Sequence, residues 1–229
     1  MTDLISYQLT DGIATLTLNN GKVNAISPEL IKQFHLHLDQ AEIDKAVVII
    51  TGQAGILSGG YDLKVMMSGP ENALNLVSQG SALTRRLLAH PYPVIAACSG
   101  HAIAKGAFLL LATDYRIGIE GDFKIGLNEV QIGMAMHYAG IELAKDRLTK
   151  PAFQRAVNNA EMFSPVAAIS AGFLDLVVAP EALAETAITV AKQCKQLNMR
   201  AHHETKLKTR HELLQRLDQA IELDKKHFG

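Results

Sequence analysis

The chain has 229 residues, 48% hydrophobic and 20% charged, with a formal net charge of −1. This composition excludes a mainly disordered chain, and the balance of charge gives no general attraction for nucleic acid or an anionic membrane. The two cysteines lack metal-ligand spacing, and the apolar runs are too short to span a bilayer. The start, MTDLISYQL, is not typical of a secretory leader. We therefore expect one large cytoplasmic domain without a metal site, a nucleic-acid partner or a membrane partner.

Short apolar runs separated by turn residues predict alternating strands and helices. Strands are expected over residues 5–18 (as a hairpin around Asp11-Gly12), 46–51, 94–98, 115–120, 123–125 and 175–178. Helices are expected over residues 27–40, 73–88 and 106–113, from 143 onward with interruptions at Pro151 and Ser164-Pro165, and as a long tail over 182–228. Residues 53–62 and 100–105 are expected to be loops. The β-branched run 46–51 indicates a strand buried on both faces, and the whole pattern predicts an α/β protein.

The helical tail carries a basic cluster made of Lys206, Lys208, Arg210 and His211. A charge run of this kind favours a solvated helix face. The alternative is contact with a phosphate of a ligand or with a partner subunit.

Two glycine-bearing turns follow buried strands and precede helices. They are LSGGYDL, residues 57–63, and SGHAIAKGAF, residues 99–108. Backbone N–H groups at a helix start lack intrahelical partners, so each turn could offer a donor to an anion. Two donors that meet at one oxygen make an oxyanion hole, whereas on spacing alone both segments can equally be simple turns.

A single carboxylate, Glu129, lies in the otherwise apolar stretch between Leu127 and Val130. Burial raises the pKa of a carboxyl group, which suits a general base that must remove a proton from carbon. The alternative is a surface glutamate at the end of a strand.

In their order along the chain, these segments resemble the crotonase (enoyl-CoA hydratase/isomerase) superfamily. The matching segments are KVNAIS, AVVIITG, LSGGYDLK, PVIAACSGHA, ATDYRI, FKIGLNEVQIG and FLDLVV. The resemblance implies a crotonase-like (ClpP/crotonase) spiral of ββα units over residues 1–195 and a helical C-terminal trimerisation region over 196–229. This region looks shorter than in typical hydratases, which implies a more open acyl pocket. The resemblance also implies an acyl-CoA substrate, no separate cofactor because coenzyme A is part of the substrate, and a homotrimer or dimer of trimers.

Matched residue by residue, the resemblance assigns the two oxyanion donors to the backbone N–H groups of Tyr61 and Lys105. The family usually has glycine where Lys105 stands, which puts the conformation of that turn in question. The substrate-binding positions implied are Ala25, Ile26, Gly60, Asp62, Leu63, Gly106, Phe108 and Ile132. Val65, Met134 and Met136 are further candidates for the wall around the acyl chain, although these apolar side chains can equally be core residues.

The acid–base residues distinguish the possible reactions. Phe108 stands where hydratases have their first glutamate, and a phenyl ring cannot transfer a proton. The remaining carboxylate, Glu129, suits a Δ3,Δ2-enoyl-CoA isomerase of the mitochondrial type, in which one base moves a proton from C2 to C4. The alternatives are a hydratase that recruits Asp62 or Glu142, another crotonase reaction such as thioester hydrolysis or decarboxylation, and a non-catalytic acyl-CoA binder.

Two histidines, His101 and His137, flank the matched loops. The family gives neither a catalytic role, and we expect both to be structural or to lie at the rim of the site.

Overall fold

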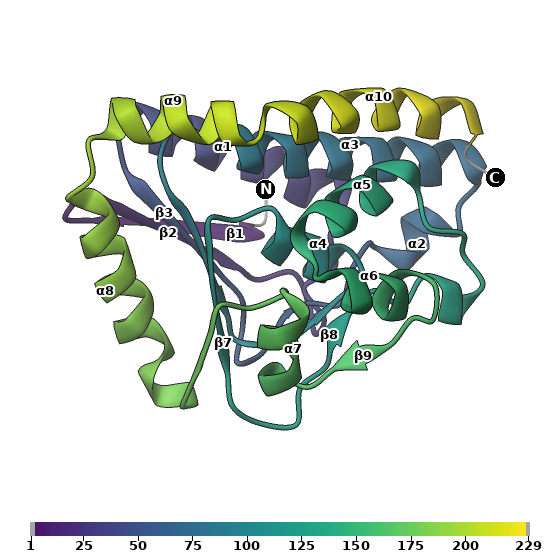
Figure 1. Ribbon diagram of the computed structural model, residues 1–229, viewed down its shortest axis with the longest axis horizontal. Coiled ribbons are helices and arrows are strands. Elements are labelled where there is room, and N and C mark those ends of the chain that lie inside the picture. Colours follow the sequence, from purple (N-terminus) through teal and green to yellow (C-terminus); the bar gives the residue numbers. More distant parts are fainter. Residues whose placement is uncertain (1–2, 228–229) are drawn as a thin grey trace.

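Two β-sheets form the centre of the computed structural model, which describes residues 3–227. The larger sheet consists, in spatial order, of β1 (Ile5–Thr10), β2 (Ile13–Leu18), β3 (Val47–Thr51), β5 (Val94–Cys98), β7 (Tyr115–Ile119) and β10 (Leu176–Val178). The smaller sheet consists of β4 (Gly55–Ser58), β6 (Gly100–Ile103), β8 (Ile125–Gly126) and β9 (Met162–Phe163). β1 pairs with β2, and β8 with β9, in antiparallel fashion, and the other neighbours run parallel. The α/β class is therefore confirmed (Figure 1).

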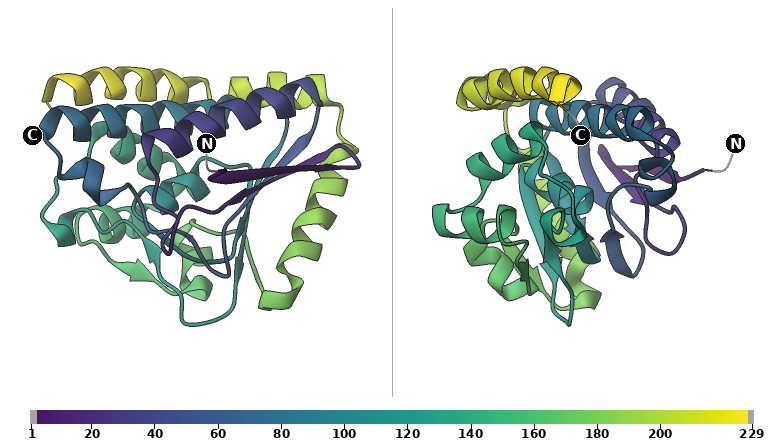
Figure 2. Two further views of the ribbon diagram at one scale, coloured as in Figure 1. Left: turned by 180° about the vertical axis from the view of Figure 1, so that it is seen from behind. Right: turned by 90° about the vertical axis from the view of Figure 1, so that its right-hand side faces the viewer.

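Helices cover both sheets. They are α1 (Pro28–Ile43), α2 (Leu63–Met66), α3 (Pro70–Ala89), α4 (Lys105–Leu111), α5 (Tyr138–Arg147), α6 (Lys150–Val157), α7 (Pro165–Ala171), α8 (Leu183–Lys195), α9 (Met199–Thr209) and α10 (His211–His227), with 3-10 turns η1 (Val130–Ile132) and η2 (Pro180–Ala182). α9 and α10 follow one another across one side of the molecule, directly over α3 (Figures 1 and 2). No helix within residues 3–227 has the length and apolarity to cross a membrane.

The chain repeats one unit: a strand of the larger sheet, a strand of the smaller sheet, then a helix. β3 and β4 lead to α2 and α3, β5 and β6 lead to α4, and β7 and β8 lead through η1 to α5. This arrangement confirms the expected spiral of ββα units. The loops that follow β4, β6 and β8 lie at the same end of the smaller sheet, because these three strands run parallel.

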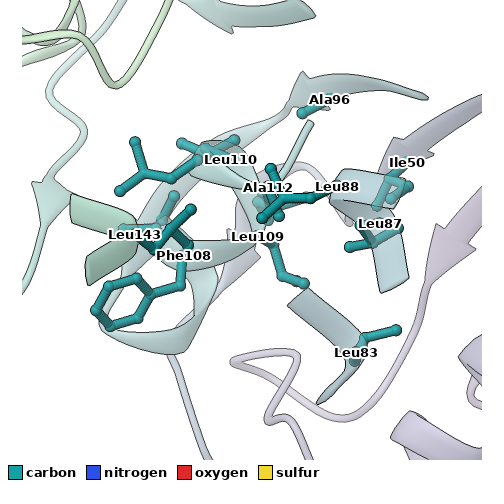
Figure 3. Packing of buried hydrophobic residues seen from close by; sticks show 14 of the residues in the cluster. Ile50, Leu83, Leu87, Leu88, Ala96, Phe108, Leu109, Leu110, Ala112 and Leu143 are labelled. Atoms are coloured by element: carbon teal, nitrogen blue, oxygen red, sulfur yellow. The ribbon is translucent and has the colours of Figure 1, made fainter. Parts of the chain in front are cut away.

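β3, in the interior of the larger sheet, is buried on both faces, as the run 46–51 predicted. Val48 and Ile50 belong to the main core, whereas Val47 and Ile49 face a second cluster that α8 completes. The main core continues around α4, every residue of which is buried between α3 and α5 (Figure 3). Apolar residues of α10, including Leu213 and Leu217, belong to this same core.

Three short strands lie where the sequence predicted other structure. β4 and β6 occupy the expected loops 53–62 and 100–105, and β9 lies within the region expected to be helical. Each has two to four residues, too few for an alternation of side chains to be visible. Their partners come from distant segments, so tertiary pairing rather than local sequence makes them strands.

Several boundaries also differ from those expected. α3 begins at Pro70 instead of residue 73, and α5 at Tyr138 instead of residue 143. The tail is helical, as expected, and it is divided into three helices, α8, α9 and α10. Asn198 begins α9 anew by accepting a hydrogen bond from the Ala201 N–H at 3.0 Å, a typical N-cap contact. Residue 228 lies outside the described residues.

Candidate active site

The two predicted glycine turns lie against each other. Gly60 has φ +105°, and a Cβ added there would lie 3.1 Å from Ala104 Cβ and 3.6 Å from the backbone N of Lys105. A Cβ on Gly106 would lie 2.2 Å from the carbonyl oxygen of Ser58, so only glycine lets the start of α4 approach β4 this closely. The structure therefore brings Tyr61 and Lys105 together.

Neither turn uses its predicted donor in a backbone hydrogen bond to the described part of the chain. Among the backbone hydrogen bonds of residues 3–227, none is donated by the N–H of Tyr61 or of Lys105. The neighbours of Tyr61 are paired instead: Ile26 N–H donates to Gly60 O at 2.8 Å, and Asp62 N–H donates to Ile26 O at 3.0 Å. Lys105 is the first residue of α4 and has no carbonyl one turn earlier to bond.

The lysine does not occupy the strained position of its turn. Ala104, the N-cap residue of α4, has φ 51°, which is an uncommon conformation for a residue with a side chain. Lys105 itself is helical. The unusual backbone conformation therefore falls one residue before the lysine, and the Lys105 N–H keeps its place at the helix start.

Glu129 is a buried carboxylate rather than a surface one. It lies directly before η1 with 8% of its surface exposed, and its Oε2 atom is buried without a hydrogen-bond partner among residues 3–227. Burial raises the pKa of Glu129 to about 7, opposed in part by a backbone hydrogen bond and by the charge of Lys105. A group with this pKa can both accept and return a proton near neutral pH.

The Lys105 side chain is also buried. Its Nζ donates to Gly80 O at 2.6 Å and to Thr84 Oγ1, and it lies 5.9 Å from the centroid of the Tyr61 ring. Burial lowers the pKa of Lys105 to about 7. Burial and the charges of Glu129 and Asp224 raise the pKa of the Tyr61 phenol, so the ring stays neutral.

The other predicted binding residues fall into two groups. Leu63 and Ile132 are exposed, at 62% and 52%, and Val65, Met134 and Met136 are half-buried. Phe108 instead belongs to the main core, where its ring meets the His137 ring edge-on at 5.4 Å. Its side chain therefore packs the interior behind α4.

Three predicted binding residues hold the loops together. The side chain of Ile26 is fully buried, and both its backbone groups are bonded to the 60–62 turn. Ala25 donates its N–H to Asn20 O at 3.3 Å. Asp62 caps α2, since its Oδ1 accepts from the Lys64 N–H at 2.9 Å.

The two flanking histidines have structural contacts, as expected. His101 Nδ1 accepts from the Lys124 N–H at 2.9 Å, and its ring packs edge-on against Phe123. His137 precedes α5 and packs against Phe108. Burial, reinforced by the charge of Lys105, lowers the pKa of His137 to about 3, so the imidazole is neutral.

Asp224, on α10, is a residue that sequence reasoning missed. Its carboxylate accepts from the N–H groups of Tyr138 at 2.7 Å and Ala139 at 3.0 Å, so it caps α5 from 86 residues further along the chain. No local pattern signals this contact, because capping signals are read within one turn of a helix start.

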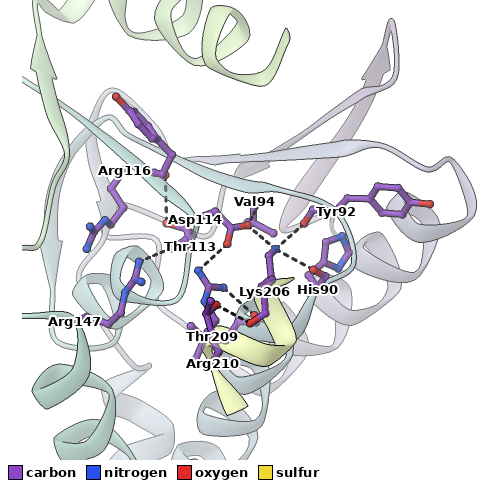
Figure 4. Close-up of polar contacts among 12 residues, drawn as sticks. His90, Tyr92, Val94, Thr113, Asp114, Arg116, Arg147, Lys206, Thr209 and Arg210 are labelled. Carbon is purple, nitrogen blue, oxygen red and sulfur yellow. Dashed lines mark hydrogen bonds and ion pairs between the residues drawn. The ribbon is translucent and has the colours of Figure 1, made fainter. Parts of the chain in front are cut away.

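The expectation that the basic tail cluster is a solvated face is wrong for two of its members. Lys206 Nζ lies 2.6 Å from Asp114 Oδ2 and also donates to the carbonyls of His90 and Tyr92. Arg210 pairs with the other oxygen of Asp114 at 2.8 Å (Figure 4). Both cations join α9 to the interior, whereas Lys208 and His211 are exposed. The sequence alone did not pair the tail with Asp114, which lies 92 residues before Lys206.

Comparisons with known proteins agree with this fold. Residues 8–229 match the family model described as enoyl-CoA hydratase/isomerase. The solved structure of an enoyl-CoA hydratase/isomerase family protein from Pseudomonas syringae is 66% identical, with TM-score 0.98 and 99% of each chain covered.

Two curated relatives carry different names. Human mitochondrial enoyl-CoA delta isomerase 1 is 27% identical over 95% of this chain and 74% of its own length. A probable enoyl-CoA hydratase of Bacillus subtilis is 35% identical over 60% of this chain, and the match spans about half of that relative, 55% of its length. Together with the ββα spiral, these matches confirm the crotonase resemblance: the chain belongs to the enoyl-CoA hydratase/isomerase family.

Proposed function

We propose that this protein is a Δ3,Δ2-enoyl-CoA isomerase in which Glu129 is the single acid–base group. The observation that carries the proposal is one buried carboxylate oxygen, Glu129 Oε2, that has no hydrogen-bond partner among the described residues. The N–H groups of Tyr61 and Lys105 likewise donate no backbone hydrogen bond within residues 3–227. The substrate would be a 3-enoyl-CoA, and no separate cofactor is required.

In the proposed reaction the Glu129 carboxylate takes a proton from C2 of the acyl chain. The electron pair of the C2–H bond moves toward the thioester, and negative charge develops on its oxygen. The N–H groups of Tyr61 and Lys105 would bind that oxygen, and removal of one such donor costs roughly 2.7–4 kcal/mol of transition-state stabilisation. Glu129 then returns the proton to C4, the double bond moves from C3–C4 to C2–C3, and the carboxylate is restored.

A hydratase is the second candidate, favoured by the name of the Bacillus subtilis relative. Hydration needs one group to activate water and a group to protonate carbon, and the loss of one of them costs about 10²-fold or more. The candidate replacement acids are already engaged. Asp62 caps α2, and Glu142 pairs with Arg216 at 2.9 Å. These contacts support a one-carboxylate reaction.

The exposed and half-buried apolar side chains near the turns would bind the acyl chain. They are Leu63, Val65, Ile132, Met134 and Met136. Methionine adapts its shape to varied ligands, so we expect activity on more than one chain length. The homotrimer or dimer of trimers implied by the resemblance stays a prediction, which light scattering would test.

The test is an absorbance assay for conjugation of 3-enoyl-CoA substrates of several chain lengths. Wild type should convert them, and Glu129→Gln should lose about 10²- to 10⁴-fold in rate, the usual contribution of a general base. Crotonyl-CoA hydration, release of free CoA and release of CO₂ are measured in parallel. A wild-type protein that is inert on every 3-enoyl-CoA, or faster on crotonyl-CoA, would overturn the proposal.

A further inference from the structure

The side chain of Lys105 has no part in the proposed reaction, which uses only the backbone N–H of this residue. It is nonetheless among the largest fully buried side chains, with 2% of the residue exposed. Lysine is almost never fully buried unless its amine is paired. The groups that bind the amine therefore show what holds the start of α4 in place.

The amine binds two oxygen atoms of α3. Lys105 Nζ donates to the carbonyl oxygen of Gly80 at 2.6 Å and to Thr84 Oγ1. Thr84 in turn donates its hydroxyl proton to Gly80 O at 3.1 Å, so the three groups close a ring of hydrogen bonds. Burial lowers the pKa of Lys105 to about 7, but the ammonium and the neutral amine both carry enough N–H groups for two acceptors. The contact with α3 therefore does not depend on the charge of the lysine.

The side chain of Tyr61 contacts the same face of α3. Its hydroxyl donates to Val77 O at 3.4 Å, and a Cβ added to Gly80 would lie 2.1 Å from the hydroxyl oxygen. Val77, Gly80 and Thr84 are three and four residues apart, so they are neighbours on one face of the helix. The side chains of Tyr61 and Lys105, whose N–H groups would bind the thioester oxygen, thus both end on this face.

The helix α3 is itself fixed on two sides. Arg86 Nη2 lies 2.5 Å from Asp39 Oδ1 of α1, and Arg85 donates to both carboxylate oxygens of Asp218 on α10, at 2.5 and 2.9 Å. These exposed pairs are individually weak, and buried residues of α3 such as Leu87 anchor the helix in the main core (Figure 3). A side chain that is bonded to α3 is therefore bonded to a firm support.

The turn before α4 has a second tie, through its backbone. The N–H of Ala104 donates to Gly126 O of β8 at 2.9 Å. Lys105 is thus connected to β8 through the residue before it and to α3 through its own side chain. The position of the Lys105 N–H depends on both connections.

We propose that Thr84 is a positioning residue: through the amine of Lys105 it holds the first N–H of α4 at its place relative to the N–H of Tyr61. The inference rests on the proposed function in so far as these two N–H groups bind the thioester oxygen. Two donors stabilise the developing charge only when both reach the same oxygen, so a small shift of one of them weakens the stabilisation. Thr84 acts through Lys105 and is not itself a catalytic residue.

The first test measures kcat and KM for a 3-enoyl-CoA in Thr84→Val, which removes the hydroxyl and keeps the branched shape. We expect kcat to fall about tenfold, since a small displacement of a catalytic group costs up to about 10²-fold. KM should stay unchanged, because the lost stabilisation acts in the transition state. Thr84→Ser keeps the hydroxyl and should recover most of the loss.

Ser81→Ala is the matched control. Ser81 lies on α3 beside the same small cavity as Thr84 and Lys105, and its buried hydroxyl has no hydrogen-bond partner among residues 3–227. The substitution therefore removes a buried hydroxyl from the same helix without breaking a contact to Lys105. It should leave kcat and KM unchanged.

A second measurement follows the thioester carbonyl directly and requires no turnover. Butanoyl-CoA labelled with ¹³C at the thioester carbonyl is bound to the protein, and its C=O band is located by infrared difference spectroscopy. Hydrogen bonds to the oxygen should lower the frequency of this band relative to free butanoyl-CoA. In Thr84→Val, and in Lys105→Met, which lacks the amine, the band should lie between its wild-type and its free position. In Ser81→Ala it should stay at the wild-type position.

Lys105→Met also supplies a second route if Thr84→Val does not fold. A wild-type kcat and a wild-type band position in the variants that fold would overturn the inference, as would equal changes in Ser81→Ala. A lower kcat with the band at its wild-type position would also overturn it, because the donors would then still be in place.

The two measurements separate this inference from the proposed function. A protein that is inert on 3-enoyl-CoA, but whose butanoyl-CoA band depends on Thr84, would refute the isomerase and leave the positioning role intact. Conversion of 3-enoyl-CoA at a rate that Thr84→Val does not change would support the isomerase and refute the positioning role. A wild-type band at the free position would refute this inference, since no donor would then reach the oxygen.

Discussion

Gly80 of α3 lies directly against Tyr61: a Cβ added to Gly80 would lie 2.1 Å from the tyrosine hydroxyl oxygen. The carbonyl of the same glycine accepts from Lys105 Nζ at 2.6 Å. One position on a helix therefore contacts both turns that carry unpaired N–H groups. The relative placement of the two donors depends on this helix as well as on the turns themselves.

Gly80→Ala should reduce activity more than it reduces stability. The added methyl would push the Tyr61 side chain out of its place, and overpacking of a core typically costs about 1–3 kcal/mol. The better helix propensity of alanine offsets roughly 1 kcal/mol of that loss. We expect kcat/KM for 3-enoyl-CoA to fall about tenfold or more, because a small displacement of a catalytic group costs up to about 10²-fold. Asn75→Ala, on the exposed side of α3, should leave both quantities near wild type.

The pH dependence of the proposed isomerisation should follow Glu129. Its pKa is raised to about 7 by burial, and the base is the ionised form, so kcat/KM should rise with pH through 7 and then level. Below the midpoint the rate should fall about tenfold per pH unit, since the reaction uses one carboxylate. A profile that is already flat from pH 5 to 8 would show that this carboxyl is not the base.

Lys105 should reduce stability at and below neutral pH. Its folded-state pKa is lowered from 10.5 to about 7 by burial, so the folded protein binds fewer protons than the unfolded chain between these values. The free energy of unfolding therefore rises with pH between the folded and the unfolded pKa of Lys105, by at most about 1.4 kcal/mol per pKa unit. Lys105→Met should remove this rise, which urea unfolding at pH 7 and pH 9 would measure. If the free energy of unfolding rises by the same amount in Lys105→Met, groups other than Lys105 cause the rise.

Asp114 should be needed to dock α9. It faces two partly or fully buried cations, Lys206 and Arg210, and removal of one partner from a buried pair typically costs about 3–5 kcal/mol. We expect Asp114→Asn to lower the free energy of unfolding by this amount in urea titrations. Arg200→Ala breaks the exposed pair with Glu204 and should cost less than about 1 kcal/mol.

The ion pairs of Asp114 with Lys206 and Arg210 should also make the free energy of unfolding depend on pH in the acid range. The charges of Lys206 and Arg210 lower the pKa of Asp114 in the folded protein, in spite of its burial. The ion pairs contribute fully to the free energy of unfolding at pH values above the pKa that Asp114 has in the unfolded chain. The contribution is lost as the pH falls through the lower pKa that Asp114 has in the folded protein. The Asp114→Asn variant should therefore show a weaker decline in stability on acidification than wild type.

Elements whose apolar residues repeat at strand or helix spacing were predicted correctly from the sequence. The run 46–51 indicated a strand buried on both faces, and Val47 and Val48 do belong to different cores. β6 could not be predicted, because its four residues become a strand only by pairing with β4 and β8. The tail was predicted to be helical, but its division at Asn198 depends on a cap that the apolar spacing does not reveal.

The candidate site, like the fold, could be predicted from the sequence only in part. Tyr61, Lys105 and Glu129 lie in short segments that resemble those of the family, so their positions followed from matched residues. Gly80 and Asp224 act through contacts with segments far away in sequence, and neither residue type marks itself as part of a site. The parts that Gly80 and Asp224 play around the site could therefore be recognised only in the three-dimensional structure.

The cap that Asp224 gives to α5 also connects α10 with the surroundings of Glu129. Asp224 accepts from the N–H groups of Tyr138 and Ala139, the first two residues of α5. The segment between Glu129 and α5 therefore has its far end held by α10, so a change in the packing of α10 should be felt at Glu129 without any direct contact.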